Sequence, residues 1–139
     1  MATIDKHITR EVIAMDAATP CREAAKVMAE KKIGAVAVRE GGRIVGVVTE
    51  RDMVVRVLAS GDSGAMPIGE AMRTDVPPIA PACSEKECSE SMRDHYTRHL
   101  LVEDKGHVVG IISMRDVIRL MLDEKEFVIG QLQTYIDGR

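Results

Sequence analysis

The sequence of 139 residues is poor in aromatic side chains: it has no tryptophan, one phenylalanine and two tyrosines. Its core must therefore be aliphatic and methionine-rich, and it offers no aromatic platform on which single-stranded bases could stack. It also has no excess of basic residues, because 19 Lys and Arg face 22 Asp and Glu, for a formal net charge of -3. Phosphate backbones are held mainly by grouped cations, so we expect no nucleic-acid partner.

Long apolar runs are missing as well. No stretch approaches the ~18 apolar residues of a membrane-spanning helix, and the N-terminal segment MATIDKHITR lacks the apolar part of a secretory signal. The three cysteines, Cys21, Cys83 and Cys88, are an odd set that fits a reducing compartment better than a disulfide framework. We therefore expect a cytoplasmic protein without a membrane partner.

What the chain does contain is an internal repeat, offset by 64 residues, that runs from Ile4 to Leu122 without a gap. The segment GVVTERD at 46–52 falls on the segment GIISMRD at 110–116. An internal repeat indicates that one copy cannot bury its apolar face alone, so the two copies should pack as one body. The predicted organisation is repeat one over 4–59, a linker over 60–67, repeat two over 68–122 and a C-terminal helix over 123–139.

Each repeat predicts an extended lead-in followed by helix, strand, strand and helix. In repeat one, Thr19 and Pro20 predict a helix start, as N-cap and first-turn proline, and an apolar stripe continues to Lys32. Apolar runs on either side of Gly41 and Gly42 predict a hairpin. Because these runs are apolar on successive residues, we expect strands covered on both faces.

Repeat two has the same pattern, with a capping box at Ser84 and Glu87 and a hairpin around Lys105 and Gly106. A second helix should follow each hairpin, over 51–58 and 115–122. The last segment, 123–136, has apolar residues near helical spacing and predicts one more amphipathic helix, packed on its own domain or on a partner subunit. The predicted fold class is α/β, with two pseudo-symmetric α-β-β-α units whose small sheets are flanked by helices.

The polar signature of the repeat lies where the last strand meets the last helix. A Thr or Ser with an aspartate three positions later is a capping-box-like helix start, worth ~0.5–2 kcal/mol, so a purely structural explanation exists. An arginine in the first helical turn is unfavourable by ~0.3–1 kcal/mol, unless an anion is held there. A hydroxyl and a guanidinium can bind a phosphate, and a carboxylate can accept hydrogen bonds from ribose hydroxyls, so the three groups together describe a nucleotide site. The residues are Thr49, Arg51 and Asp52 in repeat one and Ser113, Arg115 and Asp116 in repeat two.

This arrangement resembles the cystathionine-β-synthase domain family, the CBS domains, which occur as tandem pairs. The resemblance covers about residues 4 to 122 and implies two clefts that bind adenosine-containing ligands, such as AMP, ADP, ATP, NAD or NADH. It implies that Asp52 and Asp116 bind the ribose of the ligand and that its phosphate lies near Thr49 and Ser113. The remaining contact positions of the family match Gly34, Ala35, Arg98 and His99 for the base, and Ile13 and Pro77 from the lead-ins.

The two copies are not equivalent at the base-contacting positions. Gly34 leaves room for the backbone to approach a base, whereas repeat two has Thr97, Arg98 and His99 there and adds charge. We therefore expect two sites of different preference, with Arg98 and His99 suited to phosphate. The resemblance also implies a homodimer that associates through helices. For the function of the chain, the resemblance implies ligand-dependent regulation of an unknown separate protein. We expect no catalysis and no catalytic cofactor.

Two other functions stay open. One is an interaction or assembly module in which the caps are only caps and the clefts are unoccupied. The other is a metal-responsive regulator that uses Cys83, Cys88, His95 and His99, although the chain has no Cys-x-x-Cys pair. No cysteine has a recognisable local base, so we predict no catalytic residues.

Overall fold

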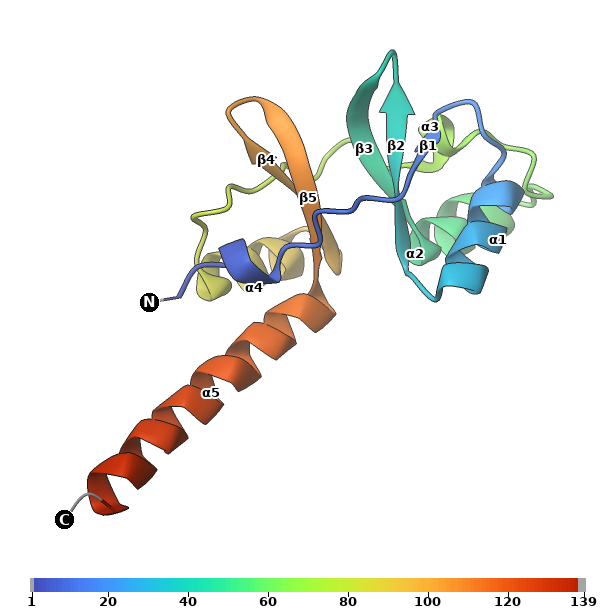
Figure 1. Ribbon diagram of the computed structural model, residues 1–139. Coiled ribbons are helices and arrows are strands. Elements are labelled where there is room, and N and C mark those ends of the chain that lie inside the picture. The colour runs from blue at the N-terminus through green and yellow to red at the C-terminus, as the bar shows by residue number, and fades with distance from the viewer. Residues whose placement is uncertain (1, 138–139) are drawn as a thin grey trace.

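The computed structural model describes residues 2–137, which form two small β-sheets with flanking helices (Figure 1). After a short 3-10 helix at Asp5–His7, the first unit comprises β1 (Ala14–Asp16), α1 (Cys21–Lys31), β2 (Ala35–Glu40), β3 (Arg43–Thr49) and α2 (Glu50–Asp52), which continues as a π-helix over Met53–Leu58. The second comprises α3 (Ile68–Ala71), α4 (Glu85–Asp94), β4 (His99–Asp104), β5 (His107–Ser113) and α5 (Met114–Asp137). The predicted α/β class with two α-β-β-α units is confirmed.

Both predicted hairpins are present. β2 pairs with β3 and β4 pairs with β5, in each case antiparallel, while β1 adds a parallel edge strand to β2. The turn residues Gly41 and Gly42 have φ of 58° and 78°, and Lys105 and Gly106 have φ of 52° and 80°. Positive φ at both central residues matches the twist of the flanking strands, which is why glycine is favoured in such turns.

The prediction that the strands are covered on both faces is correct only for β2. Its residues from Ala35 to Val38 are all buried, whereas β3 and β4 alternate between buried and more exposed positions. Val45 in β3, for example, is 46% exposed. A run of apolar residues therefore did not distinguish a fully buried strand from one whose second face remains open.

Each repeat buries its lead-in segment in the core of the other repeat. Ile4 and Ile8 belong to the core of the second unit, and Ile68 and Ala71 belong to the core of the first. The N-terminal segment also pairs with β5, because Thr9 and Ile111 exchange two backbone hydrogen bonds of 2.9 and 3.0 Å. Figure 1 shows this segment passing β5 before it reaches β1. Neither core is complete without the other repeat.

The predicted N-cap residue of the first helix is wrong. Pro20, not Thr19, is the N-cap residue of α1, and it makes no side-chain cap hydrogen bond. The free amides of Cys21 and Arg22 instead donate to the carbonyls of Met66 and Gly64, at 2.8 and 2.9 Å. The predicted N-cap of α4 is confirmed, since Ser84 Oγ accepts from the Glu87 amide at 3.1 Å. The Glu87 carboxylate accepts from the Ser84 hydroxyl at 3.2 Å and not from the Ser84 amide, so the capping box is only half formed.

The last part of the chain is one helix, not the two that the sequence predicts. α5 continues through Leu122 and Asp123 for 24 residues, because no glycine or proline interrupts it there. His7 Nε2 lies 2.9 Å from Asp123 Oδ2, where the helix leaves the body of the molecule, and the rest projects outward (Figure 1). Residues 138 and 139 of the predicted segment lie outside the described residues. Within 2–137, no helix has the length and apolarity needed to cross a membrane.

Candidate functional site

Both Ser/Thr-x-x-Asp motifs form capping boxes. In the first, the Thr49 amide donates to Asp52 Oδ2 at 2.9 Å, and the Asp52 amide donates to Thr49 Oγ1 at 3.2 Å. In the second, the amide and hydroxyl of Ser113 donate to Asp116 Oδ2 at 2.8 and 2.9 Å, and the Asp116 amide donates to Ser113 Oγ at 3.2 Å. Each motif therefore stabilises a helix start, as its structural explanation requires.

The caps do not use all the polar atoms of the motifs. The hydrogen bonds to the two aspartate side chains end on Oδ2, and no hydrogen bond from residues 2–137 reaches Oδ1 of Asp52 or Asp116. Arg51 and Arg115 are exposed, and within the same residues neither makes a hydrogen bond or an ion pair. One carboxylate oxygen and one guanidinium are therefore unengaged at each helix start.

Each motif opens into a cleft of a size typical for small-molecule sites. The first cleft has a volume of about 830 Å³ and is lined by Thr49, Arg51 and Asp52 together with lead-in and strand residues of repeat two. The second cleft has a volume of about 510 Å³, and its lining includes Ser113, Arg115 and Asp116 of repeat two with Ile13, Gly34 and Ala35 of repeat one.

Each cleft therefore combines the motif of one repeat with the lead-in and strand start of the other. This pairing follows from the way the repeats pack on each other, and no local signal in the sequence reveals it. Pro77 is not among the residues that line the first cleft, whereas Val76 and Pro78 are. Pro77 lies between them in the chain and is exposed.

One wall is common to both clefts and consists of Glu50, Arg98, His99 and Met114. Arg98 Nη2 lies 3.8 Å from Glu50 Oε1, which links the start of β4 to the start of α2. His99 packs against Gly34, where an added Cβ would lie 3.1 Å from the imidazole Cε1. Gly34 thus makes room for a side chain of the other repeat. Burial lowers the pKa of His99, with the Arg98 guanidinium acting in the same direction against the Glu50 carboxylate.

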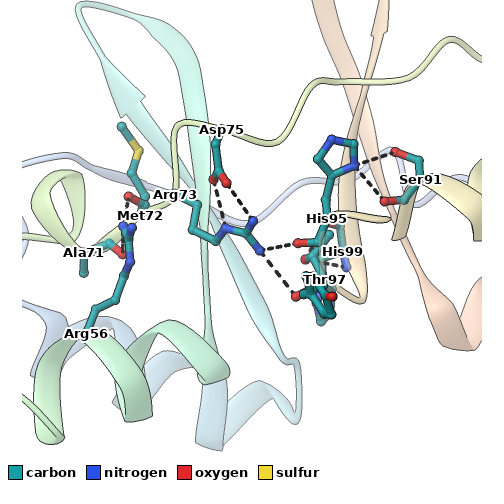
Figure 2. A network of polar contacts seen from close by, with 10 residues as sticks. Arg56, Ala71, Met72, Arg73, Asp75, Ser91, His95, Thr97 and His99 are labelled. Atoms are coloured by element: carbon teal, nitrogen blue, oxygen red, sulfur yellow. Dashed lines mark hydrogen bonds and ion pairs between the residues drawn. The ribbon is translucent and has the colours of Figure 1, made fainter. Parts of the chain in front are cut away.

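Three further arginines that sequence analysis did not identify line the first cleft: Arg56, Arg73 and Arg93. Figure 2 shows the first two, which the fold holds by hydrogen bonds. Arg73 donates to both carboxylate oxygens of Asp75 at 2.9 Å and to the backbone carbonyl of His95. Its guanidinium holds the pKa of Asp75 at about 2. Arg56 Nη1 donates to the Met72 carbonyl at 2.8 Å. Both guanidiniums are thus engaged by the fold, and the charge of Arg73 is compensated by Asp75.

The clefts differ in the charged residues that line them. In the first, five arginines face three carboxylates: Arg51, Arg56, Arg73, Arg93 and Arg98 against Glu50, Asp52 and Glu103. In the second, three cations face three carboxylates: Lys32, Arg98 and Arg115 against Glu11, Glu50 and Asp116. Two of the five arginines have a carboxylate partner just outside the lining, Arg73 with Asp75 at 2.9 Å and Arg93 with Asp94 at 3.3 Å. With these partners included, positive and negative charges balance in both clefts.

The four residues considered for a metal site do not form one. Cys88 is fully buried in the core of the second unit, and burial raises the pKa of its thiol to about 12. His95 Nδ1 lies 2.8 Å from the Ser91 carbonyl oxygen, and His99 lies at the wall between the clefts. In the part of the chain that the structure describes, no three His, Cys, Asp or Glu side chains come together as metal ligands.

Comparison with known proteins gives a family. The CBS domain family matches residues 4–59 and 68–123. The CBS domain-containing protein YhcV of Bacillus subtilis (strain 168) is 31% identical over 117 residues, which cover 84% of this chain and 84% of YhcV. A solved structure of a protein with CBS domains from Burkholderia ambifaria MC40-6 superimposes with a TM-score of 0.82 at 32% identity, covering 88% of this chain and 95% of that one.

A more distant solved structure, CBSX2 in complex with AMP, shares the fold with a TM-score of 0.74 at 21% identity, covering 90% of this chain and 99% of CBSX2. The family match extends over both repeats, and the fold and the motifs agree with it. The chain belongs to the CBS-domain family and contains two CBS domains.

Proposed function

We propose that this chain binds a phosphorylated adenosine compound in its clefts and thereby regulates a separate protein. CBS-domain pairs are regulatory modules that often bind adenosine ligands, and CBSX2 was solved as a complex with AMP. The proposed ligands are AMP, ADP, ATP, NAD and NADH. We also propose that the protein acts in the cytoplasm and catalyses no reaction itself.

The observation that carries this proposal is the pair of unengaged groups at each helix start. The free Oδ1 of Asp52 or Asp116 would accept hydrogen bonds from ribose hydroxyls, because a carboxylate is a strong acceptor. The free guanidinium of Arg51 or Arg115, together with the helix N-terminus, would hold the phosphate. The cap and the ligand site therefore use different atoms of the same motif and do not exclude each other.

The rest of each cleft would hold the base. In the second cleft, Ile13, Gly34 and Ala35 form a largely apolar lining, which suits a planar purine. In the first cleft, Arg98 and His99 correspond to Gly34 and Ala35, and the lead-in contributes Val76 and Pro78, the two neighbours of Pro77. The difference supports unequal ligand preferences in the two clefts.

The second cleft would transmit its state through α5. Met114, Arg115 and Asp116 line this cleft and are the first three residues of the helix, whose far end at Asp137 projects from the body. Exposed apolar side chains on that helix would pair with a second copy to give a homodimer. A ligand changes such an arrangement only by its different affinity for the two states.

A melting-temperature screen tests the proposed function. The full chain is heated with AMP, ADP, ATP, NAD, NADH or S-adenosylmethionine, each at a high concentration. At 100 times its dissociation constant, a ligand adds ~2.7 kcal/mol to the free energy of unfolding, which is a readily measured shift. At least one adenosine phosphate should raise the melting temperature. No shift with any of the six compounds would contradict the proposal.

A second candidate function is an assembly module with unoccupied clefts. It is favoured by the exposed apolar side chains of α5, which include Phe127, Ile129, Leu132 and Ile136 at 54–66% exposure. This function also predicts a dimer, but it predicts no melting shift with any adenosine compound. The same screen therefore separates the two candidates.

A further inference from the structure

One cation on the common wall faces both clefts. Arg98 lines the first cleft and the second cleft alike, and it projects between them with its side chain 70% exposed. Its one partner among residues 2–137 is Glu50, at 3.8 Å and 63% exposed. An ion pair as exposed as this contributes only ~0–1 kcal/mol, so a ligand phosphate would readily displace Glu50 from Arg98.

Each cleft otherwise has one arginine that the fold leaves unengaged. In the first cleft, Arg56 and Arg73 are held by backbone carbonyls and Asp75, which leaves Arg51. In the second cleft, the corresponding residue is Arg115. Each cleft therefore has one unengaged guanidinium of its own. The first cleft has Arg93 as a further cation, which is paired with the neighbouring Asp94, and Arg98 is the one arginine that lines both clefts.

We infer that Arg98 is a phosphate ligand shared by the two clefts and that it makes two phosphorylated ligands bind with negative cooperativity. This inference rests on the proposed function. A phosphate in one cleft takes Arg98 and releases the Glu50 carboxylate, which lines the other cleft as well. The second ligand then lacks a cation and meets an uncompensated anion. Because coupling is reciprocal, its size does not depend on which cleft fills first.

The second cleft shows the effect of the loss most clearly. With Arg98 taken, Lys32 and Arg115 remain there against the three carboxylates Glu11, Glu50 and Asp116. The balance of charge changes from even to negative, which opposes an anionic ligand. Adenosine carries no phosphate and does not compete for Arg98, so it should fill the two clefts independently.

Calorimetric titration of the full chain with AMP and with adenosine measures this coupling. Asp52→Ala and Asp116→Ala each disable one cleft and give the affinity of the other alone. The product of these two association constants, compared with the overall constant for double occupancy of the wild type, gives the coupling factor. We expect double occupancy by AMP to be disfavoured about tenfold, within the usual range for coupled sites, and adenosine to show no coupling.

Arg98→Ala should remove the coupling for AMP, and Glu50→Gln should reduce it while leaving Arg98 in place. Arg43→Ala, at the exposed start of β3 and outside both clefts, is the matched control and should keep the tenfold effect. Coupling that persists in Arg98→Ala, or that is equal for adenosine, overturns the shared arginine and leaves the proposed function standing. A wild-type chain that binds neither AMP nor adenosine overturns both.

Discussion

Gly34 lies against the imidazole of His99, so that a Cβ on residue 34 would come within 3.1 Å of His99 Cε1 and 3.3 Å of Nε2. The contact joins the strand start of one repeat to the strand start of the other. It also lies at the wall between the clefts, because Gly34 lines the second cleft and His99 lines both. The position of His99 therefore depends on the absence of a side chain at residue 34.

The first prediction concerns this contact. Gly34→Ala should destabilise the fold by ~1–3 kcal/mol, because the methyl group overpacks against His99 and Glu50 Oε1. Gly130→Ala is the control, since nothing lies within 4 Å of the added Cβ on α5. That change should stabilise the helix by ~0.5–1 kcal/mol. Urea unfolding measures both, and a Gly34→Ala chain as stable as wild type would show that His99 moves away without cost.

The second prediction compares the equivalent glycines of the two last strands. An added Cβ at Gly110 would lie 2.3 Å from Ile8 Cγ2 and 2.7 Å from the Thr9 carbonyl oxygen, whereas at Gly46 the near contact is Met72 Sδ at 2.6 Å. Backbone bound to Ile111 cannot move aside, but a methionine side chain can. Gly110→Ala should therefore cost ~3 kcal/mol or more and Gly46→Ala ~1 kcal/mol. Equal losses of unfolding free energy would mean that the lead-in of repeat one is not held against β5.

The parts of the fold that the sequence predicts are those fixed by local contacts. The helix caps join residues three positions apart, as at Ser113 and Asp116, and the hairpin turns are set by glycines at their centre. The start of α1 depends instead on carbonyls of Gly64 and Met66. A prediction from neighbouring residues alone assigns that cap to Thr19. The carbonyls that accept from the first amides of the helix are more than 40 positions away in the chain, so the local sequence does not reveal them.

The residues of the clefts likewise divide into those that the local sequence predicts and those that depend on how the repeats pack. The motif residues Asp52 and Asp116 are recognisable from the repeat, and each lines a cleft. The partners across each cleft depend on the exchange of lead-ins between the repeats, which is a property of the packed molecule. The Arg73 and Asp75 pair is two residues apart, but only the neighbouring carbonyl of His95 shows that this guanidinium belongs to the cleft wall.

The third prediction is a pH dependence of stability. Burial lowers the pKa of His99 in the folded chain, so below the ordinary histidine pKa of about 6.5 the unfolded chain binds the extra proton first. The unfolding free energy should therefore be highest above that pH and should fall as the pH drops towards 5. His99→Gln should flatten this dependence, and the exposed His107→Gln should preserve it. Denaturant melts between pH 5 and 8 measure the slope, and an unchanged slope in His99→Gln would exclude this residue as its source.

The fourth prediction concerns the proposed homodimer. Ile129 and Leu132 are 54% and 58% exposed on the projecting part of α5, so a charge there should oppose pairing without disturbing either core. Ile129→Asp combined with Leu132→Asp should convert a dimer to a monomer in analytical ultracentrifugation and should retain cooperative melting. Gln131→Asp on the same helix should remain dimeric. A double variant that is still a dimer would place the interface elsewhere. A wild-type chain that is a monomer would contradict the proposed homodimer.

The fifth prediction separates the cap from the ligand site. Asp52→Ala and Asp116→Ala each remove a capping box and should cost ~0.5–2 kcal/mol of stability, and Ser84→Ala should cost a similar amount at a helix start outside both clefts. Only the two aspartate variants should lose ligand binding, each in one cleft.

The most direct test of the account is the number of AMP molecules bound per chain, measured by calorimetric titration of the wild type, Asp52→Ala, Asp116→Ala and Ser84→Ala. We expect two for the wild type and for Ser84→Ala, and one for each aspartate variant. Aspartate variants that lose stability but still bind two AMP molecules, or a wild-type chain that binds none, would show that these motifs serve only as helix caps.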